Sequence, residues 1–362
     1  MNRRRFLQST GAACAGFAWA NSVRVLADTH SPNAWRTFEV TTKVEVLKPS
    51  GVTRIWLPAS LIRDTPFQRT LANRYRAEAG TVKFIKNKRD ALGMVLASYA
   101  PHQKPVLTLV SRVMVKDYDV DLSVPESTAQ VSQAELDHFL EPTRYIPTRG
   151  IVQETALKAI AGASTEVEKA RAIYDWVVEN TFRDRNVQGC GRGDIGAMLE
   201  SGNLSGKCAD LNALFVGLAR SVGLPARDVY GVRIAKSEFG YKSLGLSTDN
   251  ATKAQHCRAE VYLRGHGWVP VDPADVRKVV LEEPPGNRPL SDEVVVRARR
   301  RLFGSWEMNW IAYNYGHEVE LPGSSRPPLP YFMYPQAETA EGPVNPLDPD
   351  DFQYEITAKE IG

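Results

Sequence analysis

The stretch SGNLSGKCADLNALFVGLARSVGLPAR, from Ser201 to Arg227, contains a regular pattern of apolar residues. From Leu211 to Val222 these residues recur at helical spacing, so they share one face of a helix. Gly223 and Pro225 follow the last of them, and both are typical of the end of a helix. The stretch therefore predicts a helix with one buried face.

Cys208 lies in the first turn of this predicted helix, and two interpretations of it are open. The free N–H groups and the positive dipole at a helix start favour a thiolate, which is the reactive form of cysteine. Unpaired cysteine is also one of the most frequently buried residues, so Cys208 could simply fill the core. The helix alone does not separate the two interpretations.

A second stretch, HCRAEVYLRGHGWVPVDPADV, has the pattern of a β-hairpin. With a three-residue loop at Leu263–Gly265, His256 lies opposite Asp272 on one face of the hairpin. A four-residue loop at Arg264–Gly267 would place the two side chains on opposite faces. In the first register a carboxylate can hold the imidazole.

Cys208, His256 and Asp272 have the side chains of a nucleophile, a base and a residue that orients the base. These three groups form acyl-enzyme intermediates in many hydrolases and transferases. The expected intermediate is a thioester on Cys208.

These motifs resemble the transglutaminase-like superfamily. GKCADLNALFVGLARSVGLPAR, then a histidine that opens a strand, then GWVPVDPAD follow in that family's order over residues 140–285. The resemblance implies an α+β, papain-related core with Cys208 as nucleophile, His256 as base and Asp272 as its orienter. The chain also looks like exported bacterial members that carry a β domain in front of this core.

One position departs from the family pattern. Many members have tryptophan two residues after the histidine, where this chain has Arg258. A cation beside His256 would disfavour the imidazolium unless Glu260, next on the same strand face, neutralises it. Alternatively, Arg258 could reach an acidic group of the substrate.

Two other charged residues are expected to be structural. Asp210 lies in the first turns of the predicted helix, where the helix dipole favours acids. Arg227, after the helix, is expected to be a buried or half-buried partner in an ion pair.

The remaining sequence divides into a β-rich part and an extension. Residues 34–126 alternate between apolar and polar, as in TFEVTTKVEV, and predict an N-terminal antiparallel β domain. Thr165 and Glu168 have the form of a capping box and predict a helix through EVEKARAIYDWVVEN. Residues 286–362 are rich in proline and aromatics and predict an ordered extension on the core with a loose terminus.

Residues 1–27 resemble a cleaved twin-arginine signal peptide, with a paired arginine followed by x-Phe-Leu. This predicts a periplasmic or secreted protein with no stable membrane span after cleavage, because the apolar stretch is short. An uncleaved N-terminal anchor is an alternative, and lipidation at Cys14 is a weaker one. Cleavage removes four arginines and no acid, so the net charge of +3 becomes −1. We therefore expect no nucleic-acid partner.

Three cysteines remain after residue 27: Cys190, Cys208 and Cys257. Cys257 is expected to point away from His256 into the core, and a Cys190–Cys257 disulfide is an alternative in an oxidising compartment. The histidine spacing does not suggest a metal site, so neither a metal nor a cofactor is expected.

The function expected from the sequence is hydrolysis of amide bonds in proteins or peptides through a thioester. Transfer of the acyl group to an amine, giving protein cross-linking, is an alternative. A non-catalytic binding or scaffold module with the same fold is another.

Overall fold

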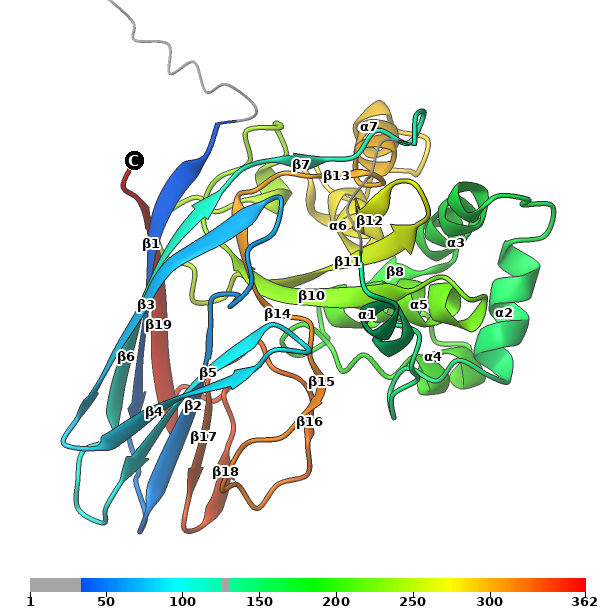
Figure 1. Cartoon of the computed structure of the whole chain (residues 1–362). Helices are drawn as coiled ribbons and strands as arrows, with labels where there is room; N and C mark the ends of the chain where they lie inside the picture. The colour runs from blue at the N-terminus through cyan, green and yellow to red at the C-terminus, as the bar shows by residue number, and fades with distance from the viewer. Residues whose placement is uncertain (1–33, 126–130) are drawn as a thin grey trace, which may run out of the picture. The chain divides into compact units, whose positions relative to one another are not determined.

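The computed structural model describes residues 34–125 and 131–362 (Figure 1). The expected signal peptide, residues 1–27, lies outside the described residues. Strands and helices are mixed, and the expected α+β class is confirmed.

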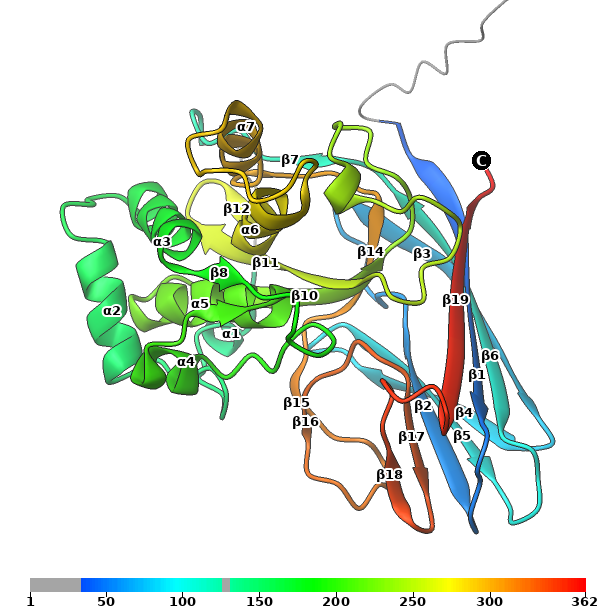
Figure 2. The same cartoon turned by 180° about the vertical axis from the view of Figure 1, so that it is seen from behind.

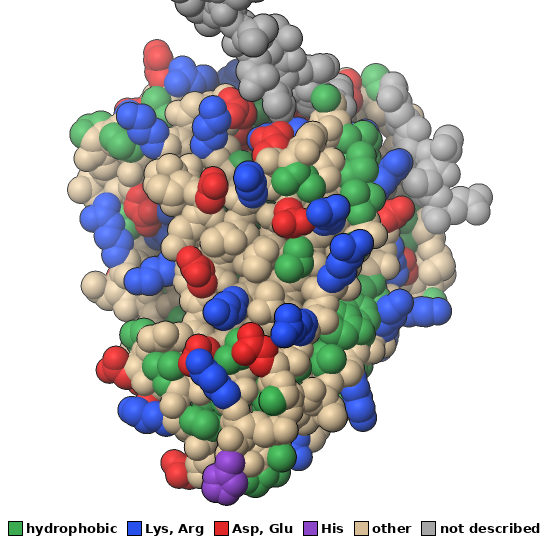
Figure 3. Space-filling view, turned by 90° about the vertical axis from the view of Figure 1, so that its left-hand side faces the viewer, with side chains coloured by type: hydrophobic (Ala, Val, Ile, Leu, Met, Phe, Trp, Pro, Cys, Tyr) green, Lys and Arg blue, Asp and Glu red, His purple; other side chains and the backbone are tan. Residues whose placement is uncertain are grey.

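Two antiparallel sheets pack face to face as a sandwich. The first has the order β19 (Phe352–Glu360), β1 (Arg36–Val46), β6 (Val106–Val115) and β3 (Gln68–Glu78). The second has the order β18 (Gly342–Val344), β17 (Gln336–Thr339), β2 (Thr53–Ala59), β5 (Leu92–Tyr99) and β4 (Thr81–Asn87). Strand β1 alternates between buried and more exposed residues, as the sequence predicted. On the face in Figure 3, basic and acidic side chains are interspersed.

The expected loose terminus is wrong, because the C-terminal residues form strands of both sheets. Strand β19 pairs with β1 along its length, from Phe38 opposite Glu360 to Val46 opposite Phe352. Strand β17 pairs with β2 in the other sheet. Figure 2 shows β19 beside β1, although almost the whole chain separates them in sequence. Such long-range pairing leaves no local signal in the sequence.

The second part of the fold is a four-stranded antiparallel sheet with helices packed on it. Its order is β12 (Gly267–Val271), β11 (Gln255–Leu263), β10 (Ala226–Arg233) and β14 (Trp310–Asn314). The helices are α1 (Gln133–His138), α2 (Ile151–Ala159), α3 (Glu166–Asn180), α4 (Ile195–Ser201), α5 (Cys208–Ser221), α6 (Pro273–Glu282) and α7 (Glu293–Arg301). Helix α3 begins with the predicted capping box, whereas α6 and α7 were not predicted.

Short elements join these parts. They are β7 (Tyr118–Asp119) with β13 (Ser305–Trp306), β8 (Phe182–Arg183) parallel to β9 (Ser205–Gly206), β15 (His317–Val319) with β16 (Leu329–Tyr331), and the 3-10 turn η1 (Lys242–Leu244). Buried Gln68, at the start of β3, clamps the sandwich to β14. Its amide donates to the Ala312 carbonyl at 2.9 Å and accepts from the Ala312 N–H at 2.7 Å.

Helix α5 begins at Cys208, as predicted, but its environment differs from the expectation. Every residue from Cys208 to Arg220 is buried, not only those of one face. The helix packs against β11 on one side and against α2, α3 and α6 on others. It is therefore the central helix of the fold, and its polar residues must all find partners inside the protein.

The hairpin has a three-residue loop, but both predicted registers are wrong. Leu263 pairs with Gly267 and Glu260 with Pro270, so the loop is Arg264–His266, one residue later than expected. Gly265, at φ 81°, takes the left-handed conformation within the loop. The pairing moves by two residues relative to the predicted register, and because side chains alternate with period two, His256 and Asp272 still share a face.

Candidate active site

Cys208 lies at the start of α5, where Asp210 organises the backbone. The Asp210 carboxylate accepts hydrogen bonds from the N–H groups of Lys207 at 2.8 Å, Arg192 at 2.9 Å and Gly193 at 2.8 Å. A side chain at Gly191 would overlap this carboxylate, since a Cβ there would lie 1.8 Å from Oδ2. Asp210 is therefore a helix cap, in agreement with its predicted structural role.

His256 is held through both its ring and its backbone. Its Nε2 lies 2.8 Å from Oδ2 of Asp272, the N-cap residue of α6. The other Asp272 oxygen, Oδ1, accepts the Asp275 N–H at 3.0 Å. The indole of Trp310 on β14 donates to the His256 carbonyl at 2.9 Å. Nε2 is thus engaged with the carboxylate, which leaves Nδ1 for a second partner.

Asp275 is a second carboxylate beside His256, and the sequence reasoning missed it. Its Oδ2 lies 3.4 Å from His256 Nε2, and both of its oxygens accept from Arg233 Nη2, at 2.6 and 2.8 Å. All these side chains are buried. The available signal was spacing: Asp275 is three residues past Asp272, one turn along a helix that begins at Pro273. No comparable signal pointed to Arg233.

These surroundings separate the pKa values of His256 and Cys208. Burial lowers the pKa of His256, but attraction from Asp275 and Asp272 outweighs burial and the Arg233 cation, and raises it to about 10. The pKa of the Cys208 thiol lies well below its ordinary value. The neighbouring Cys190 and Cys257 thiols lower it most, and burial opposes them. A hydrogen bond with His256 and the charge of that ring lower it further. Thiolate and imidazolium are the favoured forms.

The two other thiols flank Cys208. All three cysteines are buried and free, so the alternative of a Cys190–Cys257 disulfide is not realised in the structure. Contact with Cys208, together with burial, raises the pKa of both Cys190 and Cys257. Both therefore stay protonated, and the Cys190 thiol donates to the Gln255 carbonyl at 3.2 Å. Cys257 is in the core as predicted, but its contact with Cys208 was not predicted.

Arg258 takes neither of its expected roles. It is 2% exposed, its guanidinium donates to the Glu307 carbonyl at 2.9 Å, and its Nε lies 3.7 Å from Asp272. Glu260 pairs instead with Arg227 at 2.7 Å, which confirms the buried ion pair predicted for Arg227. Arg258 is thus a structural cation next to Asp272 and is not among the residues that line the cavity beside Cys208.

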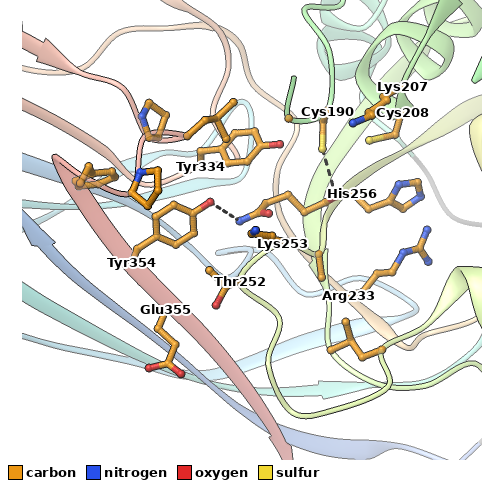
Figure 4. A pocket seen from close by; sticks show the side chains of 18 of the residues that line it. Cys190, Lys207, Cys208, Arg233, Thr252, Lys253, His256, Tyr334, Tyr354 and Glu355 are labelled. Carbon is orange, nitrogen blue, oxygen red and sulfur yellow. Dashed lines mark hydrogen bonds between the residues drawn. The ribbon is translucent and has the colours of Figure 1, made fainter. Parts of the chain in front are cut away.

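Cys208 and His256 line a cavity of about 820 Å³. The residues that line it include Lys207 and Gln255 next to these two, Lys43 on β1, and Tyr334 and Tyr354 in the C-terminal part of the chain. Figure 4 shows Cys208 and His256 on one side of it and both tyrosines across from them. The Cys208 N–H donates to no acceptor within the described part of the chain, so it is free to bind an oxyanion.

His256, Asp272 and Asp275 could geometrically hold a metal ion, because one donor atom of each lies within 4.8 Å of the others. However, Asp272 Oδ2 is engaged by His256, and both oxygens of Asp275 accept from the Arg233 guanidinium. A cation here would compete with that guanidinium at close range. The residues present therefore fit an internal charge network better than a metal centre.

The α+β fold and the arrangement of Cys208, His256 and Asp272 are typical of proteins with a papain-related core. A family model described as "Transglutaminase-like superfamily" matches residues 153–273, and the chain belongs to this superfamily. It is 32% identical to an uncharacterised protein of Haemophilus influenzae, over 97% of both chains. A candidate cysteine protease from Cytophaga hutchinsonii shares the fold, with a TM-score of 0.55 and 14% identity over 91% of this chain and 92% of that one. Within the described residues, no helix is long and apolar enough to span a membrane.

Proposed function

We propose that the protein is a cysteine enzyme that hydrolyses amide bonds of proteins or peptides, with Cys208, His256 and Asp272 as its catalytic residues. The observation that carries the proposal is the pairing of a low-pKa thiol at the start of α5 with an imidazole held by a carboxylate at 2.8 Å. This is the arrangement that covalent acyl transfer requires.

In the first half-reaction, the Cys208 thiolate attacks the carbonyl carbon of the amide. The oxyanion that forms accepts a hydrogen bond from the free backbone N–H of Cys208. As the C–N bond breaks, the His256 imidazolium gives its proton to the departing amine, and a thioester remains on Cys208. Asp272 holds the ring in place for this transfer.

In the second half-reaction, neutral His256 takes a proton from water, and the hydroxide attacks the thioester. The C–S bond breaks, the carboxylic acid leaves, and the thiolate–imidazolium pair is restored. The cavity of about 820 Å³ has room for water beside a bound acyl group. An amine in place of water would give cross-linking.

The test uses unfolded casein as substrate in the presence of dansyl cadaverine. Mass spectrometry should find new peptide ends or deamidated side chains with the native protein and none with Cys208→Ala. Dansyl incorporation without hydrolysis would replace the proposal by acyl transfer. No product from several such proteins, with Cys208 no more reactive than the other thiols, would favour a binding module.

We further propose that the protein is exported and acts in the periplasm or outside the cell. The support is the sequence alone, namely Arg3 and Arg4 followed by Phe6 and Leu7. Expression in a bacterium should give a mature form that begins near Asp28 in the periplasmic fraction. Replacement of both arginines by lysine should retain the precursor inside. An unprocessed native protein in the cytoplasm would refute export.

A further inference from the structure

Among the charged residues that line the cavity beside Cys208, cations predominate. Its basic lining residues outnumber the acidic ones, Glu45 and Glu355, by three to one. The basic residues are Lys43, Arg183, Lys207, Arg233, Lys253 and Lys278.

On the side near Cys208, these cations outnumber the carboxylates that form ion pairs with them. Glu282 is shared by Arg183 and Lys278. Within residues 34–125 and 131–362, no ion pair joins Lys207 to a carboxylate. Arg233 is paired with Asp275. The unmatched charge on this side is positive.

Three of these cations surround the start of α5. Lys207 directly precedes Cys208, and Arg183 on β8 pairs with Gly206 on β9, one residue earlier. Lys278 lies on α6, one turn after Asp275. Burial and the neighbouring Arg183 and Arg233 cations lower the pKa of Lys278 even though Glu282 is bound to it. An additional anion would relieve this repulsion.

We infer that Arg183, Lys207 and Lys278 form a carboxylate subsite, so that the substrates are acidic peptides with a carboxylate close to the amide that Cys208 attacks. This inference rests on the proposed function and narrows its substrate class. Such a subsite would also orient the amide against the thiolate, since a fixed second contact restricts the bound geometry.

The test compares two alkylating reagents of similar size, anionic iodoacetate and neutral iodoacetamide. The ratio of their rate constants at Cys208, measured by peptide mapping, reports the local potential and cancels the reactivity of the thiol itself. We expect Lys207→Gln to lower the iodoacetate-to-iodoacetamide ratio about threefold and Lys207→Glu about tenfold, with smaller effects at high salt. Lys207 is only partly buried, so these variants should fold.

The matched control is Lys158→Gln, because Lys158 is exposed on α2 and does not line the cavity. It should leave the ratio unchanged. A ratio that is equal in native protein, Lys207→Gln and Lys207→Glu would overturn the subsite. Failure of both reagents to favour Cys208 over the other thiols would instead count against the proposed function.

A second arm uses paired peptides that differ only in Glu or Gln beside a scissile amide. Preferential turnover of the Glu peptides, lost in Lys207→Glu and kept in Lys158→Gln, supports the subsite. Equal turnover of both members of every pair would contradict it while leaving the proposed hydrolase intact.

Discussion

At the scale of single residues, the site is a balanced set of buried charges. His256, Arg233 and Arg258 supply three cations, while Asp272, Asp275 and the Cys208 thiolate supply three anions. Buried charges are stable only when they are paired, and the Cys208 thiolate is one of the anions that face the His256 imidazolium. The network therefore accounts for the thiolate as well as for the position of the ring.

Asp275→Asn should break this balance. Arg233 would lose its bidentate partner and remain as a buried charge, so we expect the free energy of unfolding to fall by about 3–5 kcal/mol. The pKa of His256 should also fall, because Asp275 is the largest influence that raises it. Urea unfolding and the pH dependence of Cys208 alkylation measure the two effects.

The control for Asp275→Asn is the double variant Asp275→Leu with Arg233→Met. Removal of both charges should recover most of the lost stability, because it leaves no unpaired ion. The pKa of His256 should remain low. If Asp275→Asn left both stability and the alkylation profile unchanged, the charge network would have no energetic role.

The pH dependence of the reaction follows from the two shifted groups. Because the pKa of Cys208 is lowered, the thiolate forms well below the ordinary thiol pKa of about 8.5. Because the pKa of His256 is raised to about 10, the imidazolium persists until the pH rises through that value. Amide turnover should therefore stay level across neutral pH and fall near pH 10. A fall between pH 6 and 7 would show that His256 titrates as a free histidine.

At the scale of elements, the start of α5 depends on one carboxylate. Asp210 accepts three backbone N–H groups, one from Lys207 just before α5 and two from the loop at Arg192 and Gly193. Gly191 leaves the space that this carboxylate occupies. The cap holds the loop after Cys190 against the helix, and the Ala209 N–H donates to the Cys190 carbonyl at 2.9 Å. Cys190 and Cys208 are thus fixed next to each other.

Asp210→Ala should therefore loosen the helix start and the thiol pair together. We expect a loss of about 2–4 kcal/mol in unfolding free energy, since one buried carboxylate serves three donors. Glu154→Ala is the matched control, because Glu154 lies in the first turn of α2 but is exposed. Thermal unfolding compares the two variants. If both lowered the stability by the same small amount, the Asp210 cap would be dispensable.

The same scale explains what the sequence could predict. The position of Cys208 at a helix start and the bounds of α3 and α5 could be predicted from the local sequence pattern and the capping residues. The contact between His256 and Asp272 could be predicted despite a two-residue error in register, because the side chains of a strand alternate between its two faces. Arg233 and the partner of Arg258 could not be predicted, because their contacts depend on how α6 and β14 pack against β10 and β11. Tertiary packing also buried all faces of α5, which a one-sided apolar pattern does not indicate.

At the scale of the whole molecule, both ends of the described chain build the cavity. Strand β19 closes the sheet beside β1 and brings Tyr354 to the cavity wall, and Lys43 comes from β1 itself. The Tyr331 hydroxyl donates to the Gly191 carbonyl at 2.6 Å, which ties the C-terminal segment to the loop near Cys208. The sandwich therefore forms part of the wall of the cavity beside Cys208.

Deletion of residues 352–362 should damage stability and site together. Strand β1 would become an open edge, and the apolar side of β19 would be lost, so we expect Tm to fall by about 10 °C. Tyr354→Phe is the control, because it keeps β19 and removes one hydroxyl, and it should leave Tm nearly unchanged. A truncated protein with native Tm and native Cys208 reactivity would contradict this role of the C-terminal strand.

The central claim, that Cys208 is an activated nucleophile paired with His256, is tested most directly by the rate of iodoacetamide labelling at each of the three cysteines in the folded protein at neutral pH. We predict fast labelling of Cys208, slow labelling of Cys190 and Cys257, and loss of the fast phase in His256→Ala with the fold retained by circular dichroism. Equal, slow labelling of all three thiols, or a Cys208 rate unaffected by His256→Ala, would contradict the account.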